Sequence, residues 1–251
     1  MTDFAWQAPI PGLRTLIHGP VPIRRIQVYG QRCSGTHAII KLIEANFGTD
    51  AFTDICGFKH WFVPPQILFP ADTLVLTIAR EPHDWLQSLH RQPWHAHPEI
   101  KAQSFSDFIR SPWHSYWDHE FWGVDPAHPV YGTEMLHERD PDTGERFANP
   151  VAKRTAKLRQ WSGLHSRAHN IALLDHAAVR SHPRNVIAAL SAATGLAMAD
   201  AFVPIDTYKG NGRKPFVTHP VVPLSEEDAA HVDRWLDPQV EAGFGFTRPR
   251  P

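Results

Sequence analysis

A short apolar strand that passes through a turn of small residues into an amphipathic helix is the feature that most constrains this fold. Ile26 and Val28 belong to the strand, and residues 30–37 form the turn. A helix that begins at such a turn directs unpaired backbone N–H groups and the positive end of its dipole toward it. The turn is therefore suited to bind a phosphate-like anion.

Further strands and helices are predicted to alternate after this unit. Residues 73–79 are apolar at nearly every position, which is typical of an interior parallel strand covered on both faces. We also predict a strand at 55–62 and one at 170–174, helices at 38–47, 84–91, 152–169, 183–193 and 226–236, and an irregular lead-in at 1–22. This alternation favours an α/β fold of three layers, with a central, mostly parallel sheet flanked by helices.

Length and composition limit the classes of function. The 251 residues suit one domain, and 25 Lys and Arg against 26 Asp and Glu give no general attraction to nucleic acid or to anionic lipid. No run of apolar residues approaches the roughly 20 that a membrane span needs. Two cysteines and the absence of a signal-peptide pattern predict a cytoplasmic protein.

Residues 92–150 lack clear periodicity and are rich in aromatic residues and histidine. This composition suits an insertion that covers the site or binds an acceptor, or else a loop-rich shell. The histidines at 90, 95, 97, 114 and 119 fit no familiar zinc spacing, so we expect no metal. We interpret Lys153, Arg154, Lys157 and Arg159 as a solvated face of the helix at 152–169.

The turn at 30–37 lacks the Lys that a Walker loop places after its second glycine. Gly35 is followed by Thr36 and His37, so binding of a magnesium nucleotide loses support. What remains is a shorter cradle in which Arg32 is the cation and Ser34 and Thr36 are hydroxyl donors.

A second candidate anion site follows the best strand. Arg80 lies at the carboxyl end of residues 73–79, where ligands bind in open parallel sheets, and Ser88 lies eight residues further on. The planar guanidinium group suits a phosphate, and the hydroxyl adds a donor. An ion pair of Arg80 with Glu81 or Asp84 is the alternative interpretation.

These two motifs together resemble the sulfotransferase family, whose members use 3′-phosphoadenosine 5′-phosphosulfate (PAPS). In that family a strand-turn-helix of Lys or Arg, Ser, Gly and Thr holds the 5′-phosphosulfate, and an Arg with a Ser eight residues later holds the 3′-phosphate. The resemblance therefore assigns residues 32–37 to the 5′-phosphosulfate, and Arg80 with Ser88 to the 3′-phosphate.

The resemblance continues in the same order along residues 26–216. Lys59 and His60 lie where cytosolic members carry the segment that contains the catalytic base. Leu174 and Asp175, followed by Pro183 and a helix to Gly195, are similar to a further family segment. The loop that closes over the 3′-phosphate in the family has its counterpart at residues 208–214, and this assigns cofactor binding to Lys209, Gly210, Arg213 and Lys214.

The sequence departs from the family pattern at Cys33, where a basic residue is usual, and at His37, where a Thr or Asn is usual. Arg32 stands one place early. Three alternatives follow: Arg32 reaches the bridging oxygen from a shifted turn, Lys59 supplies the charge, or the protein binds the nucleotide without turnover.

The resemblance implies transfer of a sulfuryl group from PAPS to a hydroxyl or amine of a small molecule or carbohydrate, with adenosine 3′,5′-bisphosphate as the product. No metal is required. Arg32, Lys59 and the amides of Gly35 and Thr36 are expected to stabilise charge on the leaving phosphate. His60 is expected to take the acceptor's proton. The alternatives are a non-catalytic nucleotide-binding or scaffold protein and an atypical P-loop phosphotransferase, and the oligomeric state stays open.

Overall fold

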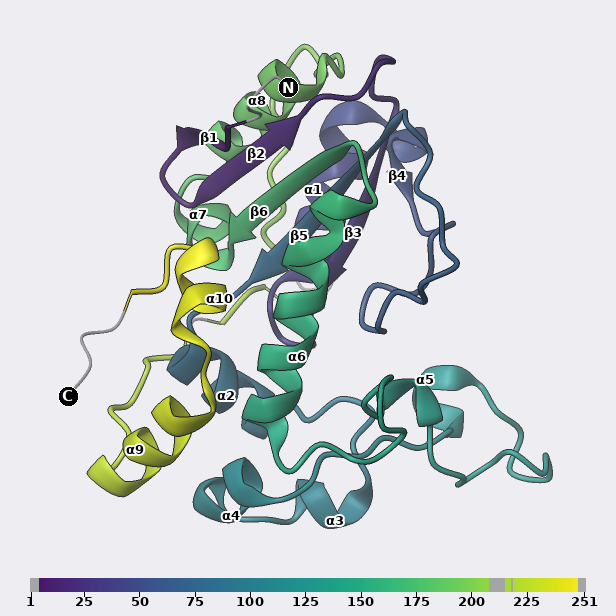
Figure 1. Ribbon diagram of the computed structural model, residues 1–251, viewed down its shortest axis with the longest axis vertical. Coiled ribbons are helices and arrows are strands. Elements are labelled where there is room, and N and C mark those ends of the chain that lie inside the picture. Colours follow the sequence, from purple (N-terminus) through teal and green to yellow (C-terminus); the bar gives the residue numbers. More distant parts are fainter. Residues whose placement is uncertain (1–4, 208–214, 218, 248–251) are drawn as a thin grey trace. The chain divides into compact units, whose positions relative to one another are not determined.

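The computed structural model describes residues 5–207, 215–217 and 219–247. It shows an α/β protein with a six-stranded, mostly parallel sheet flanked by helices (Figure 1), which confirms the predicted class at this level. The chain forms two compact units. We call Met1–Glu81, Leu158–Pro220 and Pro238–Pro251 the sheet unit, and Pro82–Lys157 and Val221–Asp237 the helical unit.

The sheet has the strand order β1-β2-β6-β5-β3-β4. Strands β4, β3, β5 and β6 are parallel to one another, whereas β2 is antiparallel to β6 and β1 is antiparallel to β2. Every residue of β5 is buried, which explains why its sequence is apolar apart from Thr73 and Thr77 and confirms the predicted interior strand. The strands are β1 (Gln7–Ile10), β2 (Leu13–Ile17), β3 (Arg25–Gly30), β4 (Phe52–Thr53), β5 (Thr73–Ala79) and β6 (Asn170–Asp175).

Helices cover both faces of the sheet because successive strand side chains point to opposite sides. On one face, α1 (Thr36–Phe47) and α8 (Pro183–Thr194) pack with α7 (His176–Ser181) against one set of strand side chains. On the other, the end of α6 (Pro150–Ser162) and the segment after α10 (Pro238–Gly243) pack against the alternate set. Figure 1 shows the carboxyl-terminal end of α6, which belongs to the sheet unit, in front of the sheet. Trp161, on α6, is fully buried and stacks on Tyr29 at 6.1 Å between ring centroids.

The N-terminal segment is not the irregular lead-in that we predicted, because it contains β1 and β2. All five residues of β2 pair with β6, from Leu13 opposite Leu174 to Ile17 opposite Asn170. Pro9 lies in β1, which is an edge strand, and an edge tolerates the missing N–H of proline. The pairing partner is more than 150 residues away in the sequence, so local pattern could not reveal it.

The strand predicted at 55–62 is also wrong, because this segment consists of turns. Two side chains of β3 bind its backbone. The Tyr29 hydroxyl donates to the carbonyl of Cys56 at 2.7 Å, and Gln27 bonds the Cys56 N–H and the Gly57 carbonyl, each at 3.2 Å. These backbone groups are thus satisfied without a neighbouring strand. Burial raises the pKa of the Tyr29 phenol far above its ordinary value, so it stays a hydrogen-bond donor.

The helical unit contains α2 and most of α6, which were expected, and the predicted irregular insertion at 92–150. Within the insertion lie only short helices: α3 (Pro98–Lys101), α4 (Phe105–Arg110), α5 (His119–Trp122) and η2 (Leu136–Glu138). The predicted helix at 84–91 is α2 (Pro82–Arg91), with Trp85, Leu86 and Leu89 buried as expected. The helix predicted at 226–236 is α9 (Glu226–Trp235), and Ser225 caps it as predicted by accepting the Asp228 N–H at 3.1 Å.

Three of the four basic residues of α6 do not lie on the solvated face that we predicted, whereas Arg159 is exposed as expected. Lys153, Arg154 and Lys157 are all buried, with exposed fractions of 6%, 0% and 3%. Both lysine ammonium groups contact the carboxylate of Glu138, which is itself 2% exposed. The Arg154 guanidinium lies over the Trp85 ring, 5.1 Å from its centroid. These positive charges are compensated inside the protein instead of by solvent.

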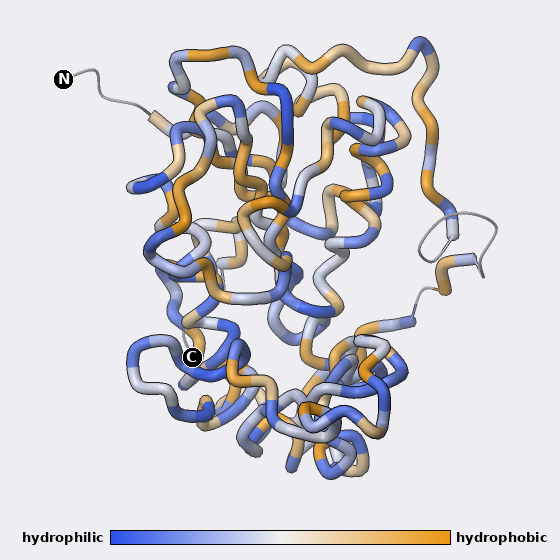
Figure 2. The backbone as a smooth tube through the Cα atoms, turned by 90° about the vertical axis from the view of Figure 1, so that its right-hand side faces the viewer, coloured by the Kyte–Doolittle hydropathy of each residue, from blue (hydrophilic) through white to orange (hydrophobic). Residues whose placement is uncertain are grey.

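Apolar and polar stretches alternate along the backbone (Figure 2), as expected for buried elements joined by exposed loops. Among the residues described, no helix is both long and apolar enough to cross a bilayer.

Candidate functional site

The carboxyl ends of the parallel strands meet at one edge of the sheet. Gly30 of β3 is in register with Ile78 of β5, and Ile78 with Leu174 of β6. Loop 31–35 and Arg80 follow these strand ends and therefore share the edge. After β3 the chain enters α1 on one face, whereas β6 is preceded by α6 on the opposite face. Ligands of open α/β sheets bind where the connections diverge in this way.

Loop 31–35 is a tight turn held by its own backbone. The Ser34 N–H and the Ser34 hydroxyl both donate to the carbonyl of Gln31, at 3.2 and 2.6 Å. Ser34 is fully buried, so its hydroxyl shapes the turn. Gly35 precedes α1 with a φ of 90°, and Cys33 has a φ of 64°, a conformation that non-glycine residues seldom adopt. Observed strain of this kind is concentrated at functional sites.

Both glycines of the turn are required by close packing. A Cβ on Gly30 would lie 2.7 Å from the Ile78 carbonyl oxygen and 2.7 Å from the Thr36 Cγ2. A Cβ on Gly35 would lie 2.5 Å from Cδ2 of His176. The loop is thus pressed against β5 on one side and against the start of α7 on the other.

Two guanidinium groups lie at this loop. Arg32 is part of it and is only 6% exposed. Arg80 is half-buried, and its Nη1 donates to the carbonyl of Cys33 at 3.2 Å. The motif after β5 therefore contacts the motif after β3, as the parallel strand order predicts. The first turn of α1 contains no acidic residue, so nothing there offsets the positive end of its dipole.

The Lys59 and His60 segment is anchored to the end of β3. The Gly30 N–H donates to the carbonyl of Lys59 at 3.0 Å, and the Gly30 carbonyl lies 2.6 Å from Nδ1 of His60. A carbonyl only accepts, so Nδ1 of His60 carries the proton and Nε2 has the lone pair. His60 is 7% exposed, and Phe58 packs edge-on against its ring at 5.1 Å. The Lys59 ammonium lies over the Phe58 ring.

The remaining predicted residues are dispersed. Thr36 begins α1 and is 3% exposed, with its methyl group toward Gly30, whereas His37 is exposed on the first turn of the same helix. Ser88 is half-buried on α2, in the helical unit. The predicted contacts at Lys209, Gly210, Arg213 and Lys214 lie outside the described residues. The roles of all these residues remain predictions.

Residues that sequence reasoning missed complete the surroundings of the loop. His176, half-buried at the start of α7, packs on Gly35 and places a third imidazole-bearing residue near the turn besides His37 and His60. The signal was available, because His176 directly follows a strand that ends at the same edge. Gln27 and Tyr29 position the segment before His60, and no sequence pattern indicated this.

Chemically, this edge offers the donors that a phosphorylated or sulfated ligand needs. Backbone N–H groups at the start of α1 and the guanidinium groups of Arg32 and Arg80 are suited to anionic oxygens. His60 adds an imidazole whose tautomer is fixed by Gly30. The residues present thus fit an anionic nucleotide. No protein-family model, curated protein or solved structure matches this chain.

Proposed function

We propose that the protein binds PAPS at loop 31–35 and transfers its sulfuryl group to a hydroxyl or amine of a small-molecule or carbohydrate acceptor. One observation carries the proposal: Arg80, expected at the 3′-phosphate, donates to the backbone of the loop expected at the 5′-phosphosulfate. Two motifs that are 47 residues apart thus meet at the ligand-binding edge of the sheet.

Each residue of the edge has a defined task in this proposal. The donor supplies an activated sulfuryl group when it is bound. Arg32 and the N–H groups of Gly35 and Thr36 hold its 5′ end and offset negative charge as the leaving phosphate forms. Arg80 binds the 3′-phosphate while it keeps the Cys33 carbonyl in place. No basic side chain is required at Cys33, because Arg32 is already within the turn.

His60 acts as the general base. The hydrogen bond from Nδ1 to the Gly30 carbonyl fixes the imidazole so that Nε2 takes the proton of the acceptor. Imidazole is the side chain most often used for such proton transfers. The same bond ties the base to the residue that opens the loop, so the base and the anion site are positioned together.

Ligand binding is tested first. The purified chain is melted with adenosine 3′,5′-bisphosphate, with AMP and with ATP–Mg²⁺. At 100 times Kd the bisphosphate adds about 2.7 kcal/mol, which corresponds to roughly 5–10 °C for a chain of this size. Arg80→Ala is expected to abolish this shift. Arg24→Ala, on an exposed residue before the opposite end of β3, is the matched control and should keep it. Stabilisation by ATP–Mg²⁺ alone would refute the proposal.

Thiol protection locates the ligand. Cys33 is half-buried in the loop, whereas Cys56 is 3% exposed and burial raises the pKa of its thiol. A thiol reagent is therefore expected to label Cys33 first. Bound bisphosphate should slow that labelling, measured by mass spectrometry of the tryptic peptides. Labelling of Cys33 at an unchanged rate with saturating bisphosphate would place the ligand elsewhere.

Transfer is tested with ³⁵S-labelled donor and a panel of phenols, sugars and amines. His60→Ala should lose most of the transfer and keep the thermal shift with bisphosphate. Unchanged turnover would exclude His60 as the base. Binding without transfer to any acceptor would leave the non-catalytic interpretation, for which Cys33 in the family's basic position is the specific observation.

A further inference from the structure

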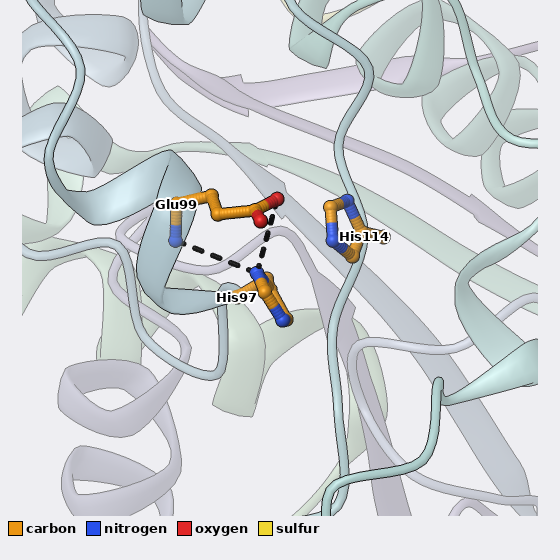
Figure 3. A group of neighbouring side chains, drawn as sticks. All are labelled: His97, Glu99 and His114. Carbon is orange, nitrogen blue, oxygen red and sulfur yellow. Dashed lines mark hydrogen bonds and ion pairs between the residues drawn. The ribbon is translucent and has the colours of Figure 1, made fainter.

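A second group of side chains with ligand chemistry lies in the helical unit, in the segment without regular secondary structure. His97, Glu99 and His114 each place one nitrogen or carboxylate oxygen within 4.8 Å of the others (Figure 3). It is the one such group of three among the described residues. The proposed sulfuryl transfer uses none of the three.

Backbone pairing holds the two histidines side by side. Ala96 and Ser115 form an antiparallel bridge, and the His97 N–H donates to the His114 carbonyl at 3.1 Å. Their rings stack at 4.7 Å between centroids, with 30° between planes. The two histidines that this pairing brings together are 17 residues apart in the sequence, which is why their spacing alone showed no metal pattern.

Glu99 joins the pair through the start of α3. His97 is the N-cap of this helix, and its Nδ1 accepts the Glu99 N–H at 3.4 Å. The same Nδ1 lies 3.5 Å from the Glu99 carboxylate oxygen Oε2. An imidazole nitrogen that accepts from the backbone carries no proton to donate to the carboxylate. Its one lone pair makes only a long hydrogen bond with the Glu99 N–H, and a cation bound between Nδ1 and Oε2 would replace that bond.

The separation itself is that of two metal ligands. Zinc bonds of about 2.0–2.1 Å to nitrogen and 2.0–2.2 Å to oxygen, in tetrahedral geometry, place neighbouring ligand atoms about 3.3 Å apart. The observed 3.5 Å between Nδ1 and Oε2 is close to this value and is long for a charged hydrogen bond. The Glu99 side chain is 78% exposed, so little packing opposes movement of its carboxylate toward an ion.

The three side chains also have the chemistry of metal ligands. Imidazole nitrogens and carboxylate oxygens are among the usual ligands of zinc. Two imidazoles and one carboxylate are a donor set suited to zinc and to other first-row divalent ions, and they leave a fourth position for water.

We propose that His97, Glu99 and His114 form a binding site for one divalent transition ion of the zinc type. The ion ties the first turn of α3 to the segment of His114, and its open position faces the solvent side where Glu99 is exposed. This site is separate from the proposed donor site, and neither requires the other.

The test uses the untagged full-length chain, freed of metal with a chelator and titrated with Zn²⁺ against a chromophoric competitor. The wild-type chain is expected to take up about one equivalent. His97→Ala and Glu99→Gln should each weaken binding by more than about tenfold, since even changes outside the ligand shell cost 10–100-fold. Glu99→Gln changes an exposed side chain and leaves the fold intact, as far-UV circular dichroism would verify.

Matched controls come from the same unit. His119→Ala and Glu120→Gln alter an exposed histidine and an exposed carboxylate of α5 and should leave the affinity unchanged. Replacement of Zn²⁺ by Co²⁺ should give visible ligand-field bands that disappear in Glu99→Gln. The absence of a saturable equivalent in the wild-type chain would overturn the proposal, as would equal losses of affinity in the control variants.

Discussion

Gly35→Ala should destabilise the fold in two ways, through backbone strain and through a steric clash. Alanine at three other glycines measures these two effects separately. Gly35→Ala introduces a side chain at a φ of 90° and places its Cβ 2.5 Å from Cδ2 of His176. Gly30→Ala creates only a clash, against the Ile78 carbonyl, because Gly30 has an ordinary φ. Gly48→Ala creates only backbone strain, since its φ is 93° and nothing lies within 4 Å of the new Cβ. Gly163→Ala creates neither and is the control.

The magnitudes follow from these geometries. A non-glycine residue at such a φ costs about 1–3 kcal/mol, and overpacking costs about 1–3 kcal/mol. Gly35→Ala should therefore lower the free energy of unfolding by about 2–6 kcal/mol, more than either single-cost variant. Gly163→Ala should be neutral or stabilise by up to about 1 kcal/mol, because alanine restricts the unfolded chain. Denaturant unfolding followed by far-UV circular dichroism measures the differences.

A second substitution identifies the clash. His176→Ala removes the atoms that the new Cβ would meet, so the double variant Gly35→Ala/His176→Ala should recover about 1–3 kcal/mol relative to additivity, and only the strain should remain. If Gly35→Ala costs no more than Gly48→Ala, or if His176→Ala gives no recovery, the reasoning that His176 is pressed against the loop is refuted.

Three further predictions concern the stability of the folded state at low pH and the contribution of two side-chain contacts to it. Two arginines lower the pKa of Glu134 to about 2, so its carboxylate stabilises the folded state fully above about pH 4.5, and this contribution is lost as the pH falls toward 2. Glu134→Gln should therefore make the free energy of unfolding less dependent on pH in that window. An unchanged pH dependence would contradict the ion pairs. Glu138→Gln leaves two buried lysines without their shared carboxylate and should cost about 3–5 kcal/mol in urea unfolding, whereas a loss below about 1 kcal/mol would show that the lysines are compensated otherwise. Tyr29→Phe removes the donor to the carbonyl of Cys56 and should cost about 1–3 kcal/mol, and a crystal structure of the variant should show the segment before His60 displaced; full stability would argue against this anchor.

The sequence was informative wherever burial produces a local pattern. The strand β5 is apolar at nearly every buried position, and α1 buries one stripe, so both were predictable from their own residues. The place of Arg80 beside the loop followed from the rule that parallel strands end at one edge. These predictions needed no knowledge of distant partners.

What could not be predicted depends on distant partners. β2 pairs with β6, and Lys153 meets Glu138, yet neither sequence segment shows these contacts. The turns at 55–62 have a strand-like composition, but side chains of β3 bind their backbone where a neighbouring strand was expected. The approach of His97 to His114 likewise depends on a bridge between irregular segments.

The position of β6 in the middle of the sheet has a consequence for how the chain is made. β6 lies between β5 and β2, so the sheet is incomplete until residue 175 has left the ribosome. By then residues 82–157, which supply most of the helical unit, have already been synthesised and can begin to collapse. The loop closure that joins β2 to β6 is long and therefore slow. We expect the edge that carries the candidate site to form among the last features of the protein, and nascent chains released before residue 170 should expose the unpaired edge of β5 to association with one another.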